Sequence, residues 1–354
     1  MLSGFINLNK PATWSSHDCV ARLRRLLQTQ KVGHGGTLDP LAIGVLPIAV
    51  GRATRLIQYL PARKVYRAVI RFGLTTTTDD LEGEVLTEQS AAHLQLSGVE
   101  AALSQFVGTL DQKPPLYSAI QVNGKRLYDL ARQGKAVDVP VRRVTIHQLV
   151  SQGWADTPSA KAASPQPELT IEIDCGPGTY IRSLARDLGR AVGTGATLAH
   201  LSRTHSNGFD LADSMTLEAL EQALSEGSFM PLPAGEAVAH LRAIALPPDL
   251  ALRWRMGQKL AFTEEGLANE RRQLAQRSTP AEDSTPEPPV RVMDAKSGDF
   301  LGIGEIRYVP PVADSCAIAQ KNLSQSNLSQ MVKPEEKRML HPILAAKMVF
   351  LPVS

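Results

Sequence analysis

One segment near the N-terminus, residues 33–51, constrains this chain more than any other: GHGGTLDPLAIGVLPIAVG. Its glycine-rich turn ends in Asp39, and Pro40 follows at once. Because proline lacks an N–H and keeps the preceding residue out of the α region, the Asp39 carboxylate is expected in a fixed, extended pose. The apolar run that follows is expected to bury this turn against a core. The run comprises Leu41, Ile43, Val45, Leu46, Ile48 and Val50.

This pattern leaves two interpretations of Asp39. An isolated aspartate in a turn of glycine and proline often caps nearby backbone N–H groups, and for the residue alone this is the safer interpretation. The glycines, however, allow a ligand to approach closely, and His34 lies in the same turn. Since functional residues concentrate in loops that a rigid scaffold positions, the apolar run favours a carboxylate that meets a ligand.

The composition is that of a globular protein. The chain has 354 residues, of which 43% are hydrophobic and 21% charged, so two domains are expected. Its three cysteines, Cys19, Cys175 and Cys316, lack the spacing of a zinc site or a disulfide framework. They favour a reducing compartment. We find no uninterrupted apolar stretch of transmembrane length and no signal-peptide pattern, which predicts a cytoplasmic protein without a membrane partner.

The charge is divided unevenly along the chain. Residues 1–150 hold 18 Lys and Arg against 11 Asp and Glu, a net charge of +7, whereas residues 151–354 hold 20 against 24, or −4. A basic first part is expected where a polyanion docks, although many proteins have a basic surface without such a partner.

Local patterns predict the following elements. Strands are expected at residues 4–10, 65–72 and 169–175, and a hairpin at residues 291–306. Helices are expected after the Ser15–Ser16 cap, over residues 99–110, after the Gly-Pro-Gly turn at 176–178, and over residues 215–224. Residues 75–84 and 154–168 are expected to be loops, and residues 113–141 a hairpin and helix outside the core. Polar composition predicts a disordered insertion at residues 264–289, and residues 322–336 are a candidate for a second one.

Three clusters can carry chemistry. The first is His34 with Asp39. The second is Tyr66, which lies on an apolar strand face and would on its own more often be a core residue. In the third, Tyr180 and Arg182 lie at a turn into a helix, where an arginine can pair with a carboxylate or simply cap a surface turn.

Together these clusters resemble the TruB family of tRNA pseudouridine-55 synthases. The order and spacing of the blocks make the resemblance specific, although each block alone is only moderately so. The matching blocks are INLNKPATWSSHD at residues 6–18, GHGGTLDPLAIGVLPIAVGRATR at 33–55, KVYRAVIRFG at 64–73, PPLYSAIQVNGKRLYDLARQG at 114–134, CGPGTYIRSLARDLG at 175–189 and L-S-R at 201–203. The C-terminal strands resemble a PUA domain, a small RNA-binding β-barrel.

The resemblance implies an α+β fold and two domains. Residues 1–240 would form the catalytic domain, with a central, mostly antiparallel, bent β-sheet flanked by helices and an RNA-contacting excursion at residues 111–143. Residues 241–354 would form the PUA-like β-barrel, which the insertion at residues 264–289 interrupts.

The resemblance also implies isomerisation of one uridine in the T arm of tRNA, by a monomer that needs no metal or organic cofactor. Asp39 would be the essential carboxylate, as a nucleophile or as a base toward the sugar, and Arg182 would keep it ionised. Tyr66 would stack on the base and serve in the final proton removal. The other implied contacts are Tyr180 and Leu201 in the base pocket, His34 where the RNA opens, Asp80 at the edge of the site, and Lys10 at the active-site loop or RNA. The expected contacts to the RNA backbone are Lys125, Arg126, Arg142 and Arg143.

Two other classes of function agree less well with this sequence. An RNA-binding factor without turnover would use the same groove but would have no need of Asp39, Arg182 and Tyr66 together. A hydrolase built on Asp39 and His34 would lack a second suitable acid, a nucleophile elbow or a set of metal ligands. A phosphate-binding loop of the Walker type is disfavoured because no Lys-Ser/Thr pair follows the glycines at the required spacing.

Overall fold

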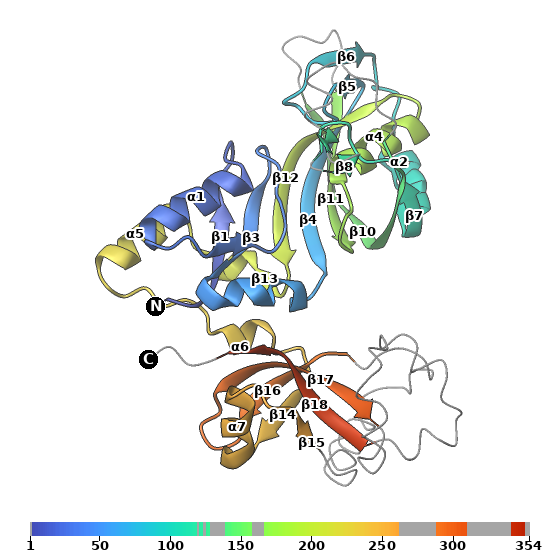
Figure 1. Ribbon diagram of the computed structural model, residues 1–354. Coiled ribbons are helices and arrows are strands. Elements are labelled where there is room, and N and C mark those ends of the chain that lie inside the picture. The colour runs from blue at the N-terminus through green and yellow to red at the C-terminus, as the bar shows by residue number, and fades with distance from the viewer. Residues whose placement is uncertain are drawn as a thin grey trace, which may run out of the picture. The chain divides into compact units, whose positions relative to one another are not determined.

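The computed structural model describes residues 2–118, 120–122, 125–127, 139–157, 166–261, 288–309 and 341–350. The chain divides into two compact units, Leu2–Leu232 and Pro233–Ser354 (Figure 1). Of the insertion expected at residues 264–289, residues 264–287 lie outside the described residues, as do residues 322–336 and Cys316.

The first unit is built on a nine-stranded sheet, in which seven strands follow the order β1-β3-β12-β4-β11-β10-β7. All its pairs are antiparallel except β3 with β12, so the expected mostly antiparallel sheet is confirmed. The strands are β1 (Gly4–Lys10), β2 (Val32–His34), β3 (Ile43–Val50), β4 (Lys64–Phe72), β7 (Gly108–Gln112), β10 (Arg142–Thr157), β11 (Gln166–Cys175), β12 (Ala196–Ser206) and β13 (Phe209–Asp210).

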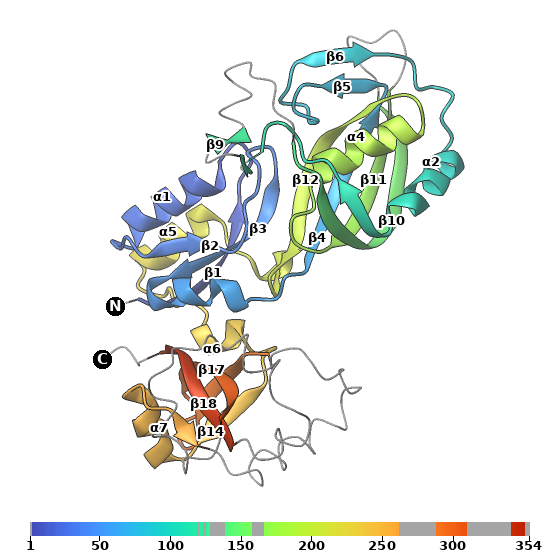
Figure 2. The same cartoon turned by 45° about the vertical axis from the view of Figure 1, so that its right-hand side comes forward.

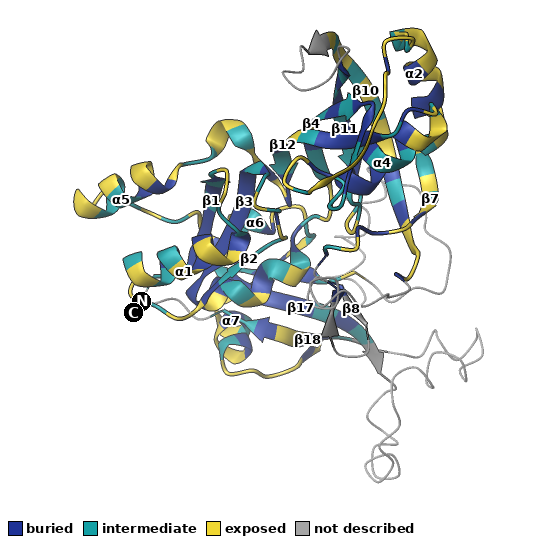
Figure 3. Ribbon diagram, turned by 90° about the horizontal axis from the view of Figure 1, so that it is seen from above, coloured by how far each residue is buried: buried dark blue, intermediate teal, exposed yellow. Residues whose placement is uncertain are grey.

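Helices cover this sheet, and residues of its strands form the core. Helix α1 begins as expected, because Ser15 and Asp18 form a reciprocal capping box. In Figure 2, α4 crosses β12 and β11, and in Figure 3 the strands are largely buried while α1 and α5 carry exposed outer faces. The helices are α1 (Ser16–Leu26), α2 (Leu96–Leu103), α4 (Ile181–Ala191) and α5 (Leu217–Ser225), with 3₁₀ turns at Gly51–Tyr59, Ser104–Phe106 and Leu211–Asp213.

Two expected boundaries were wrong because pairing across the sheet overrides the local pattern. The helix expected over residues 99–110 ends at Leu103, and after a 3₁₀ turn Gly108 takes φ +103° and begins β7, which pairs with β10. The loop expected over residues 154–168 is strand at both ends. There Trp154 packs on Phe72 with ring centroids 5.7 Å apart, and Leu169 pairs with Trp154.

The expected loop at residues 75–84 was also partly wrong. Strands β5 (Leu74–Thr76) and β6 (Val85–Glu88) form a two-stranded ribbon around it. In the excursion, β8 (Gln121–Val122) pairs with β9 (Lys125–Arg126), which confirms a hairpin; the expected helix lies outside the described residues.

The second unit holds a five-stranded sheet in the order β14-β16-β17-β18-β15, and the hairpin expected at residues 291–306 is confirmed. The fully buried Trp254 of α7 anchors its core and donates its indole N–H to Leu301 O at 3.2 Å. The elements are α6 (Ala234–Ala237), β14 (Ala243–Leu246), α7 (Pro248–Arg255), β15 (Leu260–Ala261), β16 (Val290–Asp294), β17 (Phe300–Val309) and β18 (His341–Val349). In the described part of the chain, no helix is long and apolar enough to cross a membrane.

Candidate active site

Asp39 lies in the loop between β2 and β3, and residues at the end of β1 and the start of α1 hold that loop in place. The ammonium of Lys10, which is fully buried, donates to the carbonyl oxygens of Trp14 at 2.5 Å, Pro11 at 2.8 Å and Pro40 at 3.3 Å. Ser16 Oγ accepts the Leu38 N–H at 2.8 Å. The resemblance implied that Lys10 contacts either the active-site loop or RNA; in the structure its ammonium contacts carbonyl oxygens at and before that loop.

Arg182 connects this loop to helix α4. Its Nε donates to Asp39 Oδ2 at 2.9 Å, and its two terminal nitrogens donate to the carbonyl oxygens of Thr78 at 3.0 Å and Tyr117 at 3.1 Å. The Arg182 side chain is 6% exposed and that of Asp39 is 34% exposed. Arg182 is therefore a buried anchor rather than the cap of a surface turn. Asp39 has its charge partner across the site and still faces solvent.

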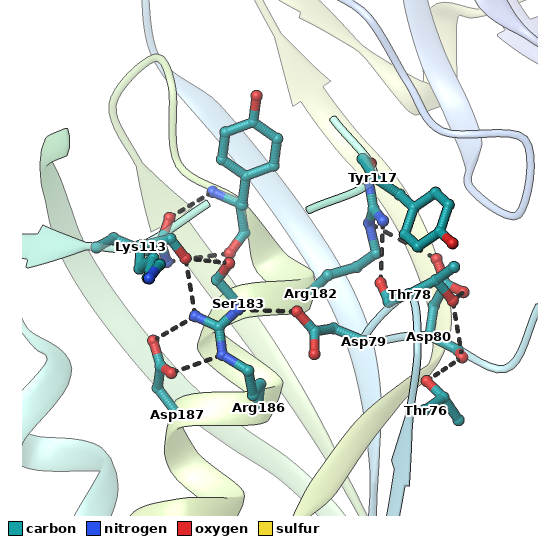
Figure 4. A network of polar contacts seen from close by, with 12 residues as sticks. Thr76, Thr78, Asp79, Asp80, Lys113, Tyr117, Arg182, Ser183, Arg186 and Asp187 are labelled. Atoms are coloured by element: carbon teal, nitrogen blue, oxygen red, sulfur yellow. Dashed lines mark hydrogen bonds and ion pairs between the residues drawn. The ribbon is translucent and has the colours of Figure 1, made fainter. Parts of the chain in front are cut away.

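Asp80 is the second carboxylate beside Arg182. Its Oδ2 lies 3.6 Å from Arg182 Nε, its side chain is 4% exposed, and its Oδ1 accepts hydrogen bonds from the Thr78 hydroxyl and, at 3.1 Å, the Glu82 N–H (Figure 4). Burial, together with the charges of Asp80 and Asp39, raises the pKa of Glu82. The arginine thus lies between two acids, of which only Asp39 is substantially open to a ligand.

A second arginine fixes the loop that carries Asp80. Arg186, one turn further along α4, donates to Asp79 Oδ2 at 2.9 Å and to Lys113 O at 2.8 Å, and it also pairs with Asp187 (Figure 4). Asp79 has a positive φ of 61°, a conformation that few side chains adopt without support. Sequence reasoning missed Arg186, although it stands four residues after Arg182 on the same helix face.

Arg203 is the main residue that sequence reasoning missed. It is fully buried in β12, and its guanidinium donates to Val45 O at 2.7 Å, Gly36 O at 3.0 Å and Thr37 O at 3.3 Å. Three carbonyl groups of the segment around Asp39 therefore share one cation. The L-S-R block contained this residue, but nothing local in the sequence indicated that its partners lie more than 150 residues earlier.

The expected base-pocket residues lie on adjacent strands. Tyr66 of β4 is opposite Arg203 of β12, and Leu201 is opposite Ala68, so strand pairing brings Tyr66 and Leu201 together. Both are buried. Burial raises the pKa of Tyr66, while the charge of Arg203 and a hydrogen bond to it act in the opposite direction.

Tyr180 and His34 flank this region. Tyr180 precedes α4, and the side-chain amide of Gln112 holds its backbone. The Gln112 Oε1 accepts the Tyr180 N–H at 2.8 Å, and the Gln112 Nε2 donates to the Tyr180 carbonyl oxygen at 3.0 Å. Its ring packs against Ile120, Leu127 and Val139. His34 Nδ1 accepts the Gly36 N–H at 3.3 Å. The pKa of His34 is lowered, mainly by burial and to a lesser extent by the nearby charges of His17 and Arg203.

The expected contacts to the RNA backbone are only partly described. Arg142 and Arg143 are exposed at the start of β10, and Arg143 Nε lies 3.4 Å from Asp111 Oδ1. For Lys125 and Arg126 the structure gives the strand pairing but not the side chains.

Among the described residues, no group of three or more His, Cys, Asp or Glu could hold a metal ion. Burial raises the pKa of the Cys19 and Cys175 thiols to about 11, so both remain protonated at neutral pH.

Comparison with solved structures gives the class of the fold. This chain is similar to one chain in a crystal structure of a Cbf5–Nop10–Gar1 complex, with a TM-score of 0.61 and 22% identity; the match covers 99% of this chain and 85% of the other. A structure of an H/ACA ribonucleoprotein bound to a substrate RNA containing 2′-deoxyuridine gives the same TM-score at 21% identity. At these identities the likeness shows that this chain shares the fold of those chains.

Sequence comparison gives the family. Residues 24–181 match the profile of the TruB family pseudouridylate synthase N-terminal domain, and residues 182–253 that of the tRNA pseudouridylate synthase B C-terminal domain. Residues 243–308 match the C-terminal profile of pseudouridine synthase II TruB.

Relatives named tRNA pseudouridine synthase B are similar over most of the chain. The one from Trichormus variabilis is 49% identical over 306 residues, which cover 86% of this chain and 95% of the relative. The one from Acaryochloris marina is 56% identical over 257 residues, or 73% and 86% of the two chains. The chain belongs to the TruB family of pseudouridine synthases, so the resemblance seen in its sequence is confirmed.

Proposed function

We propose that this chain converts uridine-55 in the T arm of tRNA to pseudouridine, with Asp39 as the essential carboxylate. The names of its relatives support tRNA as the substrate. The single observation that supports the role of Asp39 is its 2.9 Å hydrogen bond from Arg182, a buried arginine, while a third of the Asp39 side chain stays exposed.

The reaction breaks the C1′–N1 glycosidic bond, rotates the uracil and joins C5 to C1′. N1 gains a proton, and C5 loses one. Asp39 either attacks C1′ as a nucleophile or removes a proton from the sugar, and in both roles the reacting form is the carboxylate. Arg182 favours that ionised form because an opposite charge within hydrogen-bond distance stabilises it.

The target base must leave the folded T loop to reach Asp39. Unstacking costs a few kcal/mol, and stacking on an aromatic side chain recovers about 1–3 kcal/mol per base. We assign that stacking to Tyr66, with Leu201 and Tyr180 lining the pocket and His34 at the point where the RNA opens. Asp80 acts at the edge of the site, and Lys10 through the loop that it holds.

Tyr66 also has the role of assisting proton removal from C5. Its raised pKa keeps the phenol protonated at neutral pH, so this role requires a neighbour that lowers the pKa again. Arg203 acts in that direction through its charge and its hydrogen bond to Tyr66.

The RNA is bound as a polyanion. Lys125, Arg126, Arg142 and Arg143 contact its backbone, and the net charge of +7 over residues 1–150 attracts it. We assign residues 1–240 to the catalytic domain and residues 241–354 to a PUA-like RNA-binding domain. The protein acts as a cytoplasmic monomer without metal or organic cofactor.

Incubation with unmodified tRNA, followed by primer extension that stops at derivatised pseudouridine, tests this function. We expect one strong stop, in the T arm, that depends on the protein. Tight binding of the tRNA without any stop would instead identify an RNA-binding factor without turnover.

A further inference from the structure

Lys64 is a cation beside the candidate active site that no step above uses. It is the first residue of β4, two residues before Tyr66, so the two side chains leave the strand on the same face. Both belong to the site side of the sheet, where β4 pairs with the β12 segment that contains Arg203.

The end of the Lys64 side chain lies against the loop that carries Asp39. A Cβ atom built on Gly36 would be 3.3 Å from Lys64 Cε and 3.7 Å from its Nζ. The same point would be 3.7 Å from a terminal nitrogen of Arg203. Two cationic groups therefore meet at Gly36, three residues before Asp39, where the chain has no side chain to cover them.

The two cations differ in their partners. The guanidinium of Arg203 is occupied by the carbonyl oxygens of Gly36, Thr37 and Val45. For the ammonium group of Lys64, a half-buried residue, the structure gives no hydrogen bond or ion pair to any described residue. The pKa of Lys64 is lowered, mainly by burial and to a lesser extent by the charge of Arg203. A partly buried cation without an anion raises the free energy of the folded protein, unless a ligand supplies the anion.

We propose that Lys64 binds a phosphate group of the substrate RNA next to the displaced uridine. This inference rests on the proposed function. A lysine ammonium is a compact point charge suited to a phosphate oxygen, and a glycine such as Gly36, which has no Cβ, lets a ligand approach the backbone closely. Because Tyr66 stands on the same strand face, the contact fixes the sugar–phosphate backbone while the base enters the pocket.

Three variants test the proposal: Lys64→Gln, Lys64→Arg and the control Arg67→Gln. Arg67 is exposed on the opposite face of the same strand, so the control removes one positive charge from β4 without affecting the site. The measurements are kcat/KM with unmodified tRNA, the dependence of tRNA affinity on salt concentration, and the thermal unfolding midpoint.

We expect Lys64→Gln to lower kcat/KM about tenfold, the effect of losing one hydrogen bond to a charged group. The slope of log affinity against log salt should become shallower by roughly 0.7–0.9, the value for one phosphate contact. Lys64→Arg should retain most of this slope, and Arg67→Gln should match the unchanged protein in both measurements. The unfolding midpoint of Lys64→Gln should stay the same or rise, because an unpaired cation has been removed.

An unchanged salt slope and kcat/KM in Lys64→Gln would overturn the proposal while leaving the proposed function intact. A clear fall in its unfolding midpoint would also overturn it, because Lys64 would then support the fold rather than bind RNA. If the unchanged protein itself formed no pseudouridine, the proposed function would fail first.

Discussion

Arg182 Nε donates to Asp39 Oδ2 over 2.9 Å, although 143 residues separate the two in the sequence. The contact joins the loop between β2 and β3 to the first turn of α4, and the other nitrogens of Arg182 bind the carbonyl oxygens of Thr78 and Tyr117. One side chain thus positions the candidate catalytic acid and two further segments that border it.

Replacing Arg182 by lysine should lower kcat, because a lysine keeps the charge but cannot reach Asp39 and both carbonyl oxygens at once. Loss of one charge-assisted hydrogen bond predicts a fall of roughly 10- to 100-fold in single-turnover rate. The control is Arg190→Lys on the same helix, whose side chain is 70% exposed. Equal rates for the two variants would show that the fork geometry of Arg182 has no part in the reaction.

Gly44 should not tolerate a side chain, since its φ is +101° and an added Cβ would lie 2.3 Å from the Arg203 carbonyl oxygen. We expect Gly44→Ala to lower the free energy of unfolding by about 2 kcal/mol or more, from backbone strain and overpacking. In Gly98→Ala the new Cβ in α2 meets nothing within 4 Å, and stability should rise by up to about 1 kcal/mol. Urea unfolding measures both; a Gly44 variant as stable as the Gly98 variant would rule out this close approach of β3 and β12.

The stability of the fold should depend on pH through His34, whose pKa is lowered by burial. Between this lowered value and the ordinary histidine pKa near 6.5, the unfolded chain binds more protons, so the free energy of unfolding rises with pH. Acidification from about pH 7 should therefore weaken the fold as His34 loses its hydrogen bond from Gly36 N–H. His34→Gln should show less of this dependence than the exposed control His93→Gln in unfolding titrations at several pH values. Identical profiles for both variants would contradict the assignment.

The sequence was informative where local pattern and three-dimensional position agree. The sequence around Asp39 predicted a turn, the Ser15–Ser16 cap predicted a helix start, and the alternation around Tyr66 predicted a strand face. The structure confirms all three. Family resemblance was needed to place Arg182 beside Asp39, because no periodicity links a loop to a helix 143 residues later.

Arg203 and the start of β7 show what local patterns leave open. The partners of Arg203 are backbone carbonyl groups brought to it by the parallel pairing of β3 with β12, and backbone acceptors leave no trace in side-chain pattern. Gly108 ends a helical pattern because its positive φ lets the chain turn into pairing with β10. Both features depend on strand pairing between distant segments, which competes with local preference and prevails.

The most direct test of the central claim is pseudouridine formation by Asp39→Asn under single-turnover conditions, with tRNA affinity measured on the same preparation. Asparagine keeps the size of the side chain and removes the charge that Arg182 pairs with. We predict no detectable pseudouridine in the T arm and tRNA affinity close to that of the unchanged protein. Pseudouridine formation by this variant at a rate near that of the unchanged protein would contradict the account.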